Sequence, residues 1–446
     1  GFYNKIVIYL DMDNHYIVIP IYSNPSLHPI HNGNDLSLLY IQQYDAKNKS
    51  LIGESKFITQ FHPDSTNVME DYSIISKNKG LIFTPDGKNL QPIFSNYKQV
   101  FCVNQAHWWI HGKPMDFEVR NNAIDFLSNK FYNVKKLNQI IPLIKHKEYC
   151  DSIRDKMFEF LNKELINLTN DGGWFDNSNL SEQAFYNIEK HGVMVSDNVC
   201  DVFDIRVKKH ISNGKLYSNY NLFTTTGRPS NSFGTVNFAA LPPDKRKVFI
   251  AENDYLVEFD FDAYHLRLIA DLVDYNFGEE SVHEHLAKHY QCSYEESKQK
   301  TFKLLYGGID KQTRESVPFF NKVHNYINKK WNEINTHNLV FTDIYRRKLL
   351  FENYNDLNRN KVFNYLIQAL ETESNIKKIL SIQDYLLKKK TKLVLYGYDS
   401  FLFDFSQQDG VETLKDIKSI LEEGKHFTKS KMGLNYGEMQ DITKRL

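Results

Sequence analysis

Two strand-like segments that each carry an aspartate at one end impose the strongest constraint on the fold of this chain. Residues 255–261 form an apolar strand pattern that leads directly into a helical one, and Asp260 lies at the strand end. Residues 391–398 and 401–405 predict a hairpin with Asp399 at its turn. A carboxylate among apolar neighbours is unstable unless it is compensated, and two such groups repel each other. The aspartates are therefore either turn and cap residues or ligands of the divalent cations that support phosphoryl transfer.

A helical pattern over residues 294–306 places a cation and two aromatic rings on one face. Lys298, Phe302 and Tyr306 follow one another at intervals of four residues, and the pattern ends at a pair of glycines. This combination suits a nucleoside triphosphate, because the ammonium attracts phosphate and the rings pack on sugar and base. An amphipathic helix whose lysine extends to solvent explains the same spacing. The helix alone leaves both interpretations open.

The segment that precedes the first aspartate is a loop rich in glycine, serine, threonine and asparagine, residues 224–235. It carries Arg228 among small residues, and a loop of this kind can follow a sugar-phosphate backbone closely. Turns frequently have the same composition, so this feature by itself is weak.

The rest of the chain predicts an α/β first part and a mainly helical segment between the two aspartates. The runs Lys5–Leu10 and 16–22 are rich in β-branched residues and predict a hairpin joined by an Asp-Asn-His turn. Further strands are predicted at 80–84 and 99–103, and helices at 134–169, 181–190, 263–273 and over most of 281–380.

Taken in order, these segments resemble the signature motifs of family A (DNA polymerase I-like) DNA polymerases over residues 215–446. Around the aspartates, the resemblance is carried by Thr226-Gly227-Arg228 (TGR loop), Asn237 with Leu241-Pro242 (N-x-x-N-I-P), DFDAYHLR at 260–267 (motif A, D-Y-S-x-x-E-L-R) and Tyr398-Asp399-Ser400 (motif C, H-D-E). Between them, it is carried by Val282-His283 with Ala287 (D-x-H-x-x-x-A), Lys298-x3-Phe302-x3-Tyr306-Gly307 (motif B), residues 341–347 (T-x-x-G-R-R) and Asn364-x3-Gln368 (N-x-P-x-Q). The order of the segments is more specific than any one of them.

The resemblance implies a DNA-directed DNA polymerase, a nucleotidyltransferase that adds dNTPs to the 3′ end of a primer. Asp260 and Asp399 would be catalytic and would bind two Mg²⁺ ions, with the Phe261 carbonyl as a further ligand and Mn²⁺ as an alternative metal. Lys298 would be a third catalytic group, because it neutralises charge that develops on the triphosphate. His283 would assist at the distal phosphates.

The same resemblance assigns further residues to the nucleotide and to the primer–template. Phe302 would pack on the incoming sugar and Tyr306 would lie near the nascent pair, with Tyr294 and His265 also in the nucleotide site. The DNA-binding residues would be Arg228, Asn237, Asn364, Gln368, Tyr398, Arg346 and Arg347. Those that reach the minor groove would read acceptors common to all correct base pairs.

The sequence departs from the family pattern at four positions. Tyr294 stands where an arginine usually precedes the motif B lysine, and Tyr398 and Ser400 replace the His and Glu of motif C. His265 replaces the motif A glutamate, which in DNA polymerases blocks a ribose 2′-OH. We hypothesise that the imidazole ring still excludes ribonucleotides.

Two alternative functions remain at this stage. Single-subunit phage-type RNA polymerases have a similar motif B and an H-D-S motif C that resembles Asp399-Ser400, although Phe302, the TGR loop and a large residue at 265 favour deoxynucleotides. A catalytically inactive DNA-binding or scaffold protein of the same family would require the loss of Asp260 or Asp399, and both are present.

The fold implied by the resemblance is an α/β and α+β multidomain protein. It combines a right-hand polymerase of palm, fingers and reduced thumb with an N-terminal RNase H-like, exonuclease-like α/β domain. The expected divisions are 1–133 (exonuclease-like), 134–214 (helical thumb or connector), 215–275 (palm), 276–345 (fingers) and 346–446 (palm).

The amino-terminal half lacks a complete set of exonuclease motifs. Asp11-Met12-Asp13 resembles a remnant of the first motif, D-x-E, and also fits a turn. Residues 101–108 resemble the second motif without its aspartate, and no third motif is visible, so we expect no proofreading activity. Residues 188–193 resemble the E-x-x-G-V element that opens the polymerase region. The short interval between this element and the TGR loop predicts a reduced thumb and low processivity without a partner protein.

The amino-acid composition excludes few further classes of function. The 55 basic residues balance 55 acidic ones, so a DNA-binding surface must come from local clustering, for which the run Lys388–Lys390 with Lys392 is one candidate. His283, His285, His289 and Cys292 have a spacing that would also suit zinc. No long apolar stretch predicts a membrane span, and four scattered cysteines favour a reduced, cytoplasmic setting. The short, diverged chain suggests a phage origin, in which case the setting is the host cytoplasm.

Overall fold

The protein divides into two compact units in the computed structural model. The model describes residues 5–12, 14–24, 26–59, 75, 77–94, 96–117, 141–171, 173–233, 236–351 and 356–446. The first unit comprises Gly1–Gly192, Asn198–Asn219 and Ser232–Val236, and the second comprises Val193–Asp197, Tyr220–Asn231 and Asn237–Leu446. Among the described residues, no helix is both long and apolar enough to span a bilayer. The finer division into palm, fingers and thumb stays a prediction.

The first unit is built on a five-stranded mixed sheet with the strand order β3-β2-β1-β4-β5. Strands β1, β2 and β3 pair antiparallel, whereas β4 and β5 run parallel to β1. The central strand β1 is almost entirely apolar because both its faces are covered. The strands are β1 (His15–Tyr22), β2 (Leu36–Asp45), β3 (Ser50–Thr59), β4 (Ile82–Thr84) and β5 (Val100–Cys102).

Helix α6 (Leu143–Asn170) packs along β2 of this sheet through one face. Its buried positions recur at three- and four-residue intervals, as an amphipathic helix requires. The Tyr44 ring meets Phe158 edge to face at 6.0 Å, and the Tyr44 hydroxyl donates to Asn162 at 3.0 Å. The other α and β elements of this unit are α1 (Lys5–Leu10), α3 (Gly87–Leu90), α4 (Val103–His111), α7 (Ser181–Glu189), α8 (Val199–Val202) and β7 (Lys215–Leu216).

The prediction of a strand at Lys5–Leu10 is wrong, because these residues form helix α1. A short apolar run fits a strand and a buried helical turn equally well, so its pattern cannot separate the two. Ile6 is buried while Val7 and Ile8 are exposed, and β1 pairs instead with β2 and β4. The predicted strands near 80–84 and 99–103 and the helix at 181–190 are confirmed. The predicted helical segment is confirmed from residue 143 onward, and its part at 134–140 lies outside the described residues.

The second unit is built on a five-stranded antiparallel sheet with the order β15-β16-β12-β17-β18. The predicted strand at 255–261 is confirmed as its central strand β12, which pairs with β16 on one side and β17 on the other. The predicted hairpin around Asp399 is confirmed as β15 and β16. The strands are β12 (Tyr255–Phe261), β15 (Lys392–Tyr396), β16 (Ser400–Phe405), β17 (Thr428–Gly433) and β18 (Gln440–Asp441).

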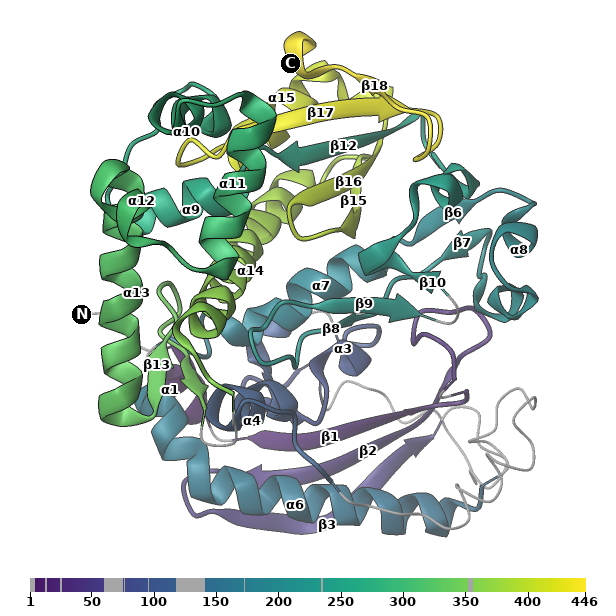
Figure 1. Ribbon diagram of the computed structural model, residues 1–446. Coiled ribbons are helices and arrows are strands. Elements are labelled where there is room, and N and C mark those ends of the chain that lie inside the picture. The colour runs from purple at the N-terminus through teal and green to yellow at the C-terminus, as the bar shows by residue number, and fades with distance from the viewer. Residues whose placement is uncertain are drawn as a thin grey trace. The chain divides into compact units, whose positions relative to one another are not determined.

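Helix α14 (Arg359–Leu386) is the long central helix of the second unit and contacts α9, α11, α13 and α15 (Figure 1). Because it is covered on several sides, polar residues within it, among them Glu371 and Asn375, are also buried. Its neighbours are α9 (Tyr264–Leu272), α10 (Val282–Tyr290), α11 (Tyr294–Gly307), α12 (Lys311–Ser316), α13 (Pro318–His337) and α15 (Val411–Leu421). Short pairs complete the unit: β6 (Val193–Val195) with β11 (Phe249–Ile250), and β13 (Leu339–Phe341) with β14 (Lys348–Leu350). Strands β8 (Tyr220–Asn221), β9 (Ser230–Phe233) and β10 (Val236–Asn237) flank the loop that carries Arg228.

Candidate active site

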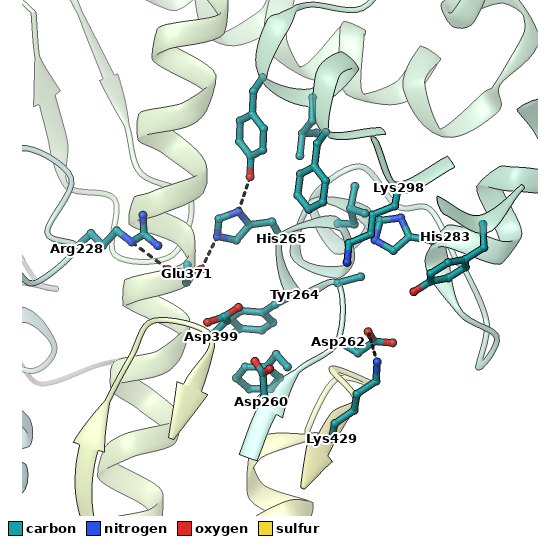
Figure 2. Close-up of a pocket in the computed structure, with 17 residues that line it drawn as sticks. Arg228, Asp260, Asp262, Tyr264, His265, His283, Lys298, Glu371, Asp399 and Lys429 are labelled. Carbon is teal, nitrogen blue, oxygen red and sulfur yellow. Dashed lines mark hydrogen bonds and ion pairs between the residues drawn. The ribbon is translucent and has the colours of Figure 1, made fainter. Parts of the chain in front are cut away.

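The pairing of β12 with β16 brings the two aspartates to the same edge of the sheet. Asp260 lies opposite Ser400 in the register, so Asp399 stands at the adjacent turn. The Phe261 amide donates to the Asp399 carbonyl at 2.8 Å, which ties the end of β12 to this turn. Figure 2 shows the two side chains beside each other at one end of a cavity.

The turn between β15 and β16 has a specific backbone requirement. The Gly397 amide donates to the Ser400 carbonyl at 2.8 Å, and a Cβ at position 397 would meet the Ser400 hydroxyl at 2.7 Å. Tyr398 has a φ of 67°, a left-handed conformation that is costly for a residue with a side chain. This turn therefore holds Tyr398 and Asp399 in defined directions.

Neither aspartate has a protein cation within ion-pair distance among the described residues. Burial raises the pKa of Asp260 to about 7, with Asp399 and Glu258 adding to the effect. Burial, followed by the nearby Glu371, also raises the pKa of Asp399. Two adjacent carboxylates with no cation in ion-pair contact are the arrangement that a bound cation would stabilise.

The aspartates line a cavity of about 410 Å³ whose opposite wall is helix α11. This helix begins with a capping box between Ser293 and Glu296 and ends at Gly308, which has a φ of 111°. The cavity is lined by Arg228, Asp260, Phe261, Asp262, Ala263, Tyr264, His265, Leu266, His283, Tyr294, Lys298, Phe302, Leu305, Tyr306, Glu371, Asp399 and Lys429. Segments far apart in the sequence thus place cation, aromatic and acidic groups around one space.

The aromatic side chains of α11 remain accessible in this cavity. Phe302 is 44% exposed and Tyr306 is 36% exposed, and their rings stack at 6.2 Å with an angle of 9° between planes. Large aromatic side chains that stay exposed inside a cavity suit contact with a planar or cyclic ligand. Lys298, one turn earlier, directs its ammonium toward the interior (Figure 2).

His283 lies behind these residues and is almost fully buried. Its ring lies 6.1 Å from Phe302 and 5.8 Å from Tyr294. Burial lowers its pKa, and Lys298 lowers it further, against an opposing effect of Asp262. Its Nδ1 atom has no hydrogen-bond partner among the described residues. The His283 side chain also lines the cavity.

A set of hydrogen bonds and ion pairs joins the base of α11 to α14. His265 hydrogen-bonds the Tyr306 hydroxyl at 2.8 Å and the Glu371 carboxylate (Figure 2). Arg228 approaches Glu371 at 3.5 Å and lies 3.8 Å from the centre of the Tyr398 ring. The cavity wall is thus fixed by side chains from five separate segments.

Sequence reasoning missed Glu371, along with Tyr264, Asp262 and Lys429, as cavity residues. A signal for Glu371 was present, because Asn364, Gln368 and Glu371 recur at i, i+4 and i+7 on one helix face.

Ten of the sequence-predicted residues line the cavity. Of the proposed DNA-binding residues, Arg228 lines it, Tyr398 lines a second cavity described below, and the other five line neither. The buried Arg347 donates to the Thr225 carbonyl at 2.9 Å, and Gln368 accepts from Thr226 at 3.2 Å. Asn237 accepts a hydrogen bond from the Ala239 amide, and Arg346 lies over the Phe341 ring. The Asn364 Oδ1 atom has no hydrogen-bond partner among the described residues. A DNA contact by any of the five stays a prediction.

A second cavity, of about 320 Å³, lies on the other side of the aspartates. Asp260, Asp399 and Ser400 line it together with Tyr398 and Arg246. The carboxylates therefore face two separate spaces, one toward α11 and one toward the turn. Such an arrangement can hold two reactants on either side of a metal centre.

One of the histidines considered for zinc, His285, is engaged elsewhere. His285 hydrogen-bonds the Tyr275 hydroxyl at 2.6 Å and Glu280 at 2.8 Å. Within the described part of the chain, no group of three or more His, Cys, Asp or Glu residues is arranged to hold a metal ion. The structure gives no support to a zinc site around His283, His285, His289 and Cys292.

No family model matches this sequence, and no curated protein sequence does so either. Comparison of structures, in contrast, finds the POL domain of Pol1 from M. smegmatis, solved in complex with a DNA primer-template and dNTP. The TM-score is 0.69 over 97% of this chain and 97% of that chain, with 12% sequence identity. The chain therefore has the fold of a DNA polymerase I POL domain.

Proposed function

We propose that the protein is a template-directed DNA polymerase that adds dNTPs to the 3′ end of a primer. The observation that carries the proposal is the meeting of Asp260 and Asp399 with Lys298, Phe302 and Tyr306 around one cavity. Fold likeness to a polymerase solved with primer-template and dNTP supports the same substrate class. Phosphoryl transfer needs little covalent help from a protein, so positioning and charge stabilisation are the functions required of these groups.

The aspartate pair fits two Mg²⁺ ions, or Mn²⁺, because no protein cation lies within ion-pair distance of it among the described residues and its ligands are hard oxygens. Asp260, Asp399 and the Phe261 carbonyl would hold the metals. When bound, such ions activate the attacking hydroxyl and stabilise the charge that develops on the transferred phosphoryl group.

The remaining groups act directly on the nucleotide in this proposal. Lys298 binds the triphosphate and offsets the charge that develops on it, and His283 donates to a distal phosphate. Phe302 packs on the sugar, and Tyr306 bounds the space for the base.

This function is tested by single-nucleotide turnover of the wild-type protein on a labelled primer–template. The dNTPs and rNTPs are supplied in separate reactions. Extension mainly with rNTPs would favour an RNA polymerase, and tight DNA binding without extension would favour the inactive alternative.

The unit that contains β12 would correspond to palm and fingers, with α10 to α13 in the fingers. Helices at 134–214 would form a reduced thumb, so a processivity partner is part of the proposal. The strand order of the first unit supports an RNase H-like, exonuclease-like domain. A phage origin stays a suggestion from sequence.

We expect this exonuclease-like domain to be inactive, because its central strand β1 contains no Asp or Glu. Asp11 precedes this strand and is exposed, and Asp13 lies outside the described residues. A labelled primer with a mismatched 3′ end should therefore stay intact with Mg²⁺ and no dNTP, in the wild type and in Asp11→Ala alike. Degradation that disappears in Asp11→Ala would contradict this prediction.

The raised pKa of Asp260 predicts that the metal-free protein loses stability as pH rises. The folded-state pKa of about 7 exceeds the usual 3.8, so the folded protein binds this proton more tightly than the unfolded chain does. The resulting loss in the free energy of unfolding is absent below about pH 4 and grows until about pH 7. Asp260→Asn removes this loss, so the variant should melt about 2–5 °C above the wild type at pH 8. The expected shift is this small because residual solvent contact weakens the effect.

Thermal unfolding in EDTA at pH 4, 5, 6, 7 and 8 measures this difference. The advantage of Asp260→Asn should vanish near pH 4, and added Mg²⁺ should stabilise only the wild type. An advantage that is equal at all pH values would show that the substitution acts through packing instead.

A further inference from the structure

The carboxyl group of Glu371 is buried in the cavity wall. Its side chain is 1% exposed, and it projects from α14 toward His265 and Arg228. A buried carboxylate is tolerated only when neighbouring groups compensate it. Both neighbouring groups line the nucleotide cavity together with Glu371, so this carboxyl group is connected to the site although its side chain is almost fully covered.

The imidazole of His265 is held from two sides by this arrangement. Its Nε2 atom meets Glu371, and its Nδ1 atom meets the Tyr306 hydroxyl at 2.8 Å. An ionised Glu371 accepts the Nε2 proton, which leaves Nδ1 to accept the tyrosine proton. Rotation of the ring would break both bonds, so these two contacts fix the position of its edge.

Arg228 completes the support of Glu371 from the opposite side. Its Nε atom is 3.5 Å from the carboxylate, an ion-pair contact, and its guanidinium lies 3.8 Å from the centre of the Tyr398 ring. Tyr398 is itself held in the left-handed conformation by the turn that presents Asp399. The position of His265 is thereby linked to the backbone that carries a proposed metal ligand.

We propose that Glu371 is a positioning residue for sugar selection, which acts by holding the His265 ring against the space beside the nucleotide sugar. A ring that cannot rotate away presents a fixed wall to a ribose 2′-OH, whereas a free ring can move aside. This inference rests on the proposed polymerase function. Glu371 itself touches neither the sugar nor the phosphates, so its removal changes discrimination more than it changes turnover of the correct nucleotide.

The test compares kcat and KM for dATP and ATP in single-nucleotide primer extension with Mg²⁺. Glu371→Ala should reduce the preference for dATP by about tenfold or more, equivalent to about 1.4 kcal/mol. Glu371→Gln keeps an oxygen acceptor at the same place and should stay within about threefold of the wild-type preference. His265→Ala should relax selection to the same extent, and the double variant should lose nothing further, because both changes free the same space.

Thr372→Ala is the matched control. It truncates the neighbouring buried residue on α14, which does not line the cavity and whose hydroxyl has no hydrogen-bond partner among the described residues. Its preference for dATP should equal that of the wild type.

The outcomes separate the two levels of the proposal. A wild-type protein that extends no primer removes the polymerase function and this inference with it. If the wild type prefers dATP and an active Glu371→Ala variant shows the same preference, only the role of Glu371 is overturned. Unchanged selection in His265→Ala overturns it as well, even if Glu371→Ala fails to fold.

Discussion

Replacing Asp399 with asparagine is expected to reduce templated primer extension on the order of 10³-fold or more. Asparagine has nearly the same shape, but its neutral amide cannot supply the charge that binds a second Mg²⁺ ion. The turn should survive, because the bonds that define it involve the backbone of residue 399: its amide donates to Gly397 and its carbonyl accepts from Phe261. The expected loss is therefore one of chemistry and not of folding.

Extension of a labelled primer by single dNTPs, followed under single-turnover conditions, measures the loss in Asp399→Asn. Asp244→Asn, a matched change of an exposed aspartate outside both cavities, should extend at the wild-type rate. Primer–template binding should be close to that of the wild type in both variants, and neither variant should unfold at a lower temperature than the wild type. An Asp399→Asn protein that retains more than about a tenth of the activity would contradict a metal-binding role for this residue.

Replacing Lys298 with alanine is expected to lower kcat/KM for dNTPs by about 10² or more. The ammonium lines the cavity close to the carboxylate pair, and no ion pair to an acidic side chain is present for it among the described residues. An unpaired cation directed into a cavity is available for the triphosphate, and it contributes most where negative charge develops. The effect should therefore appear in kcat as well as in KM.

Lys303→Ala provides the control for Lys298→Ala on the same helix. Lys303 is exposed and does not line the cavity, so its removal takes one charge from α11 without altering the site. The two variants should have similar stability and differ in dNTP turnover. Equal activity of both would show that Lys298 serves only as a solvated surface residue.

Several elements were determined by the sequence alone because local pattern and burial agree in them. The strand at 255–261, the hairpin around Asp399 and the helix that carries Lys298, Phe302 and Tyr306 all appear where alternation or four-residue spacing predicts them. In each, the side chains that must be buried already repeat with the period of the element. The one clear error, Lys5–Leu10, is a run too short to carry a period.

The site itself depended on contacts between distant segments, which local pattern cannot encode. Motif resemblance predicted its acidic, cationic and aromatic members, but not how the wall between them is supported. Glu371 lies more than a hundred residues from His265 and Arg228, and its role follows only from the packing of α14 beside α9 and α11. Likewise Arg347, expected at DNA, is buried against the Thr225 carbonyl.

Sequence thus determined which residue types are present and which local elements carry them, because propensity and periodicity act over a few residues. Tertiary structure decided which of these residues meet. The register of β12 against β16 sets Asp260 beside Asp399, and the burial of α14 converts an ordinary glutamate into a charge that must be paired. Both outcomes arise from long-range packing, where the cost of an uncompensated buried charge selects the partners.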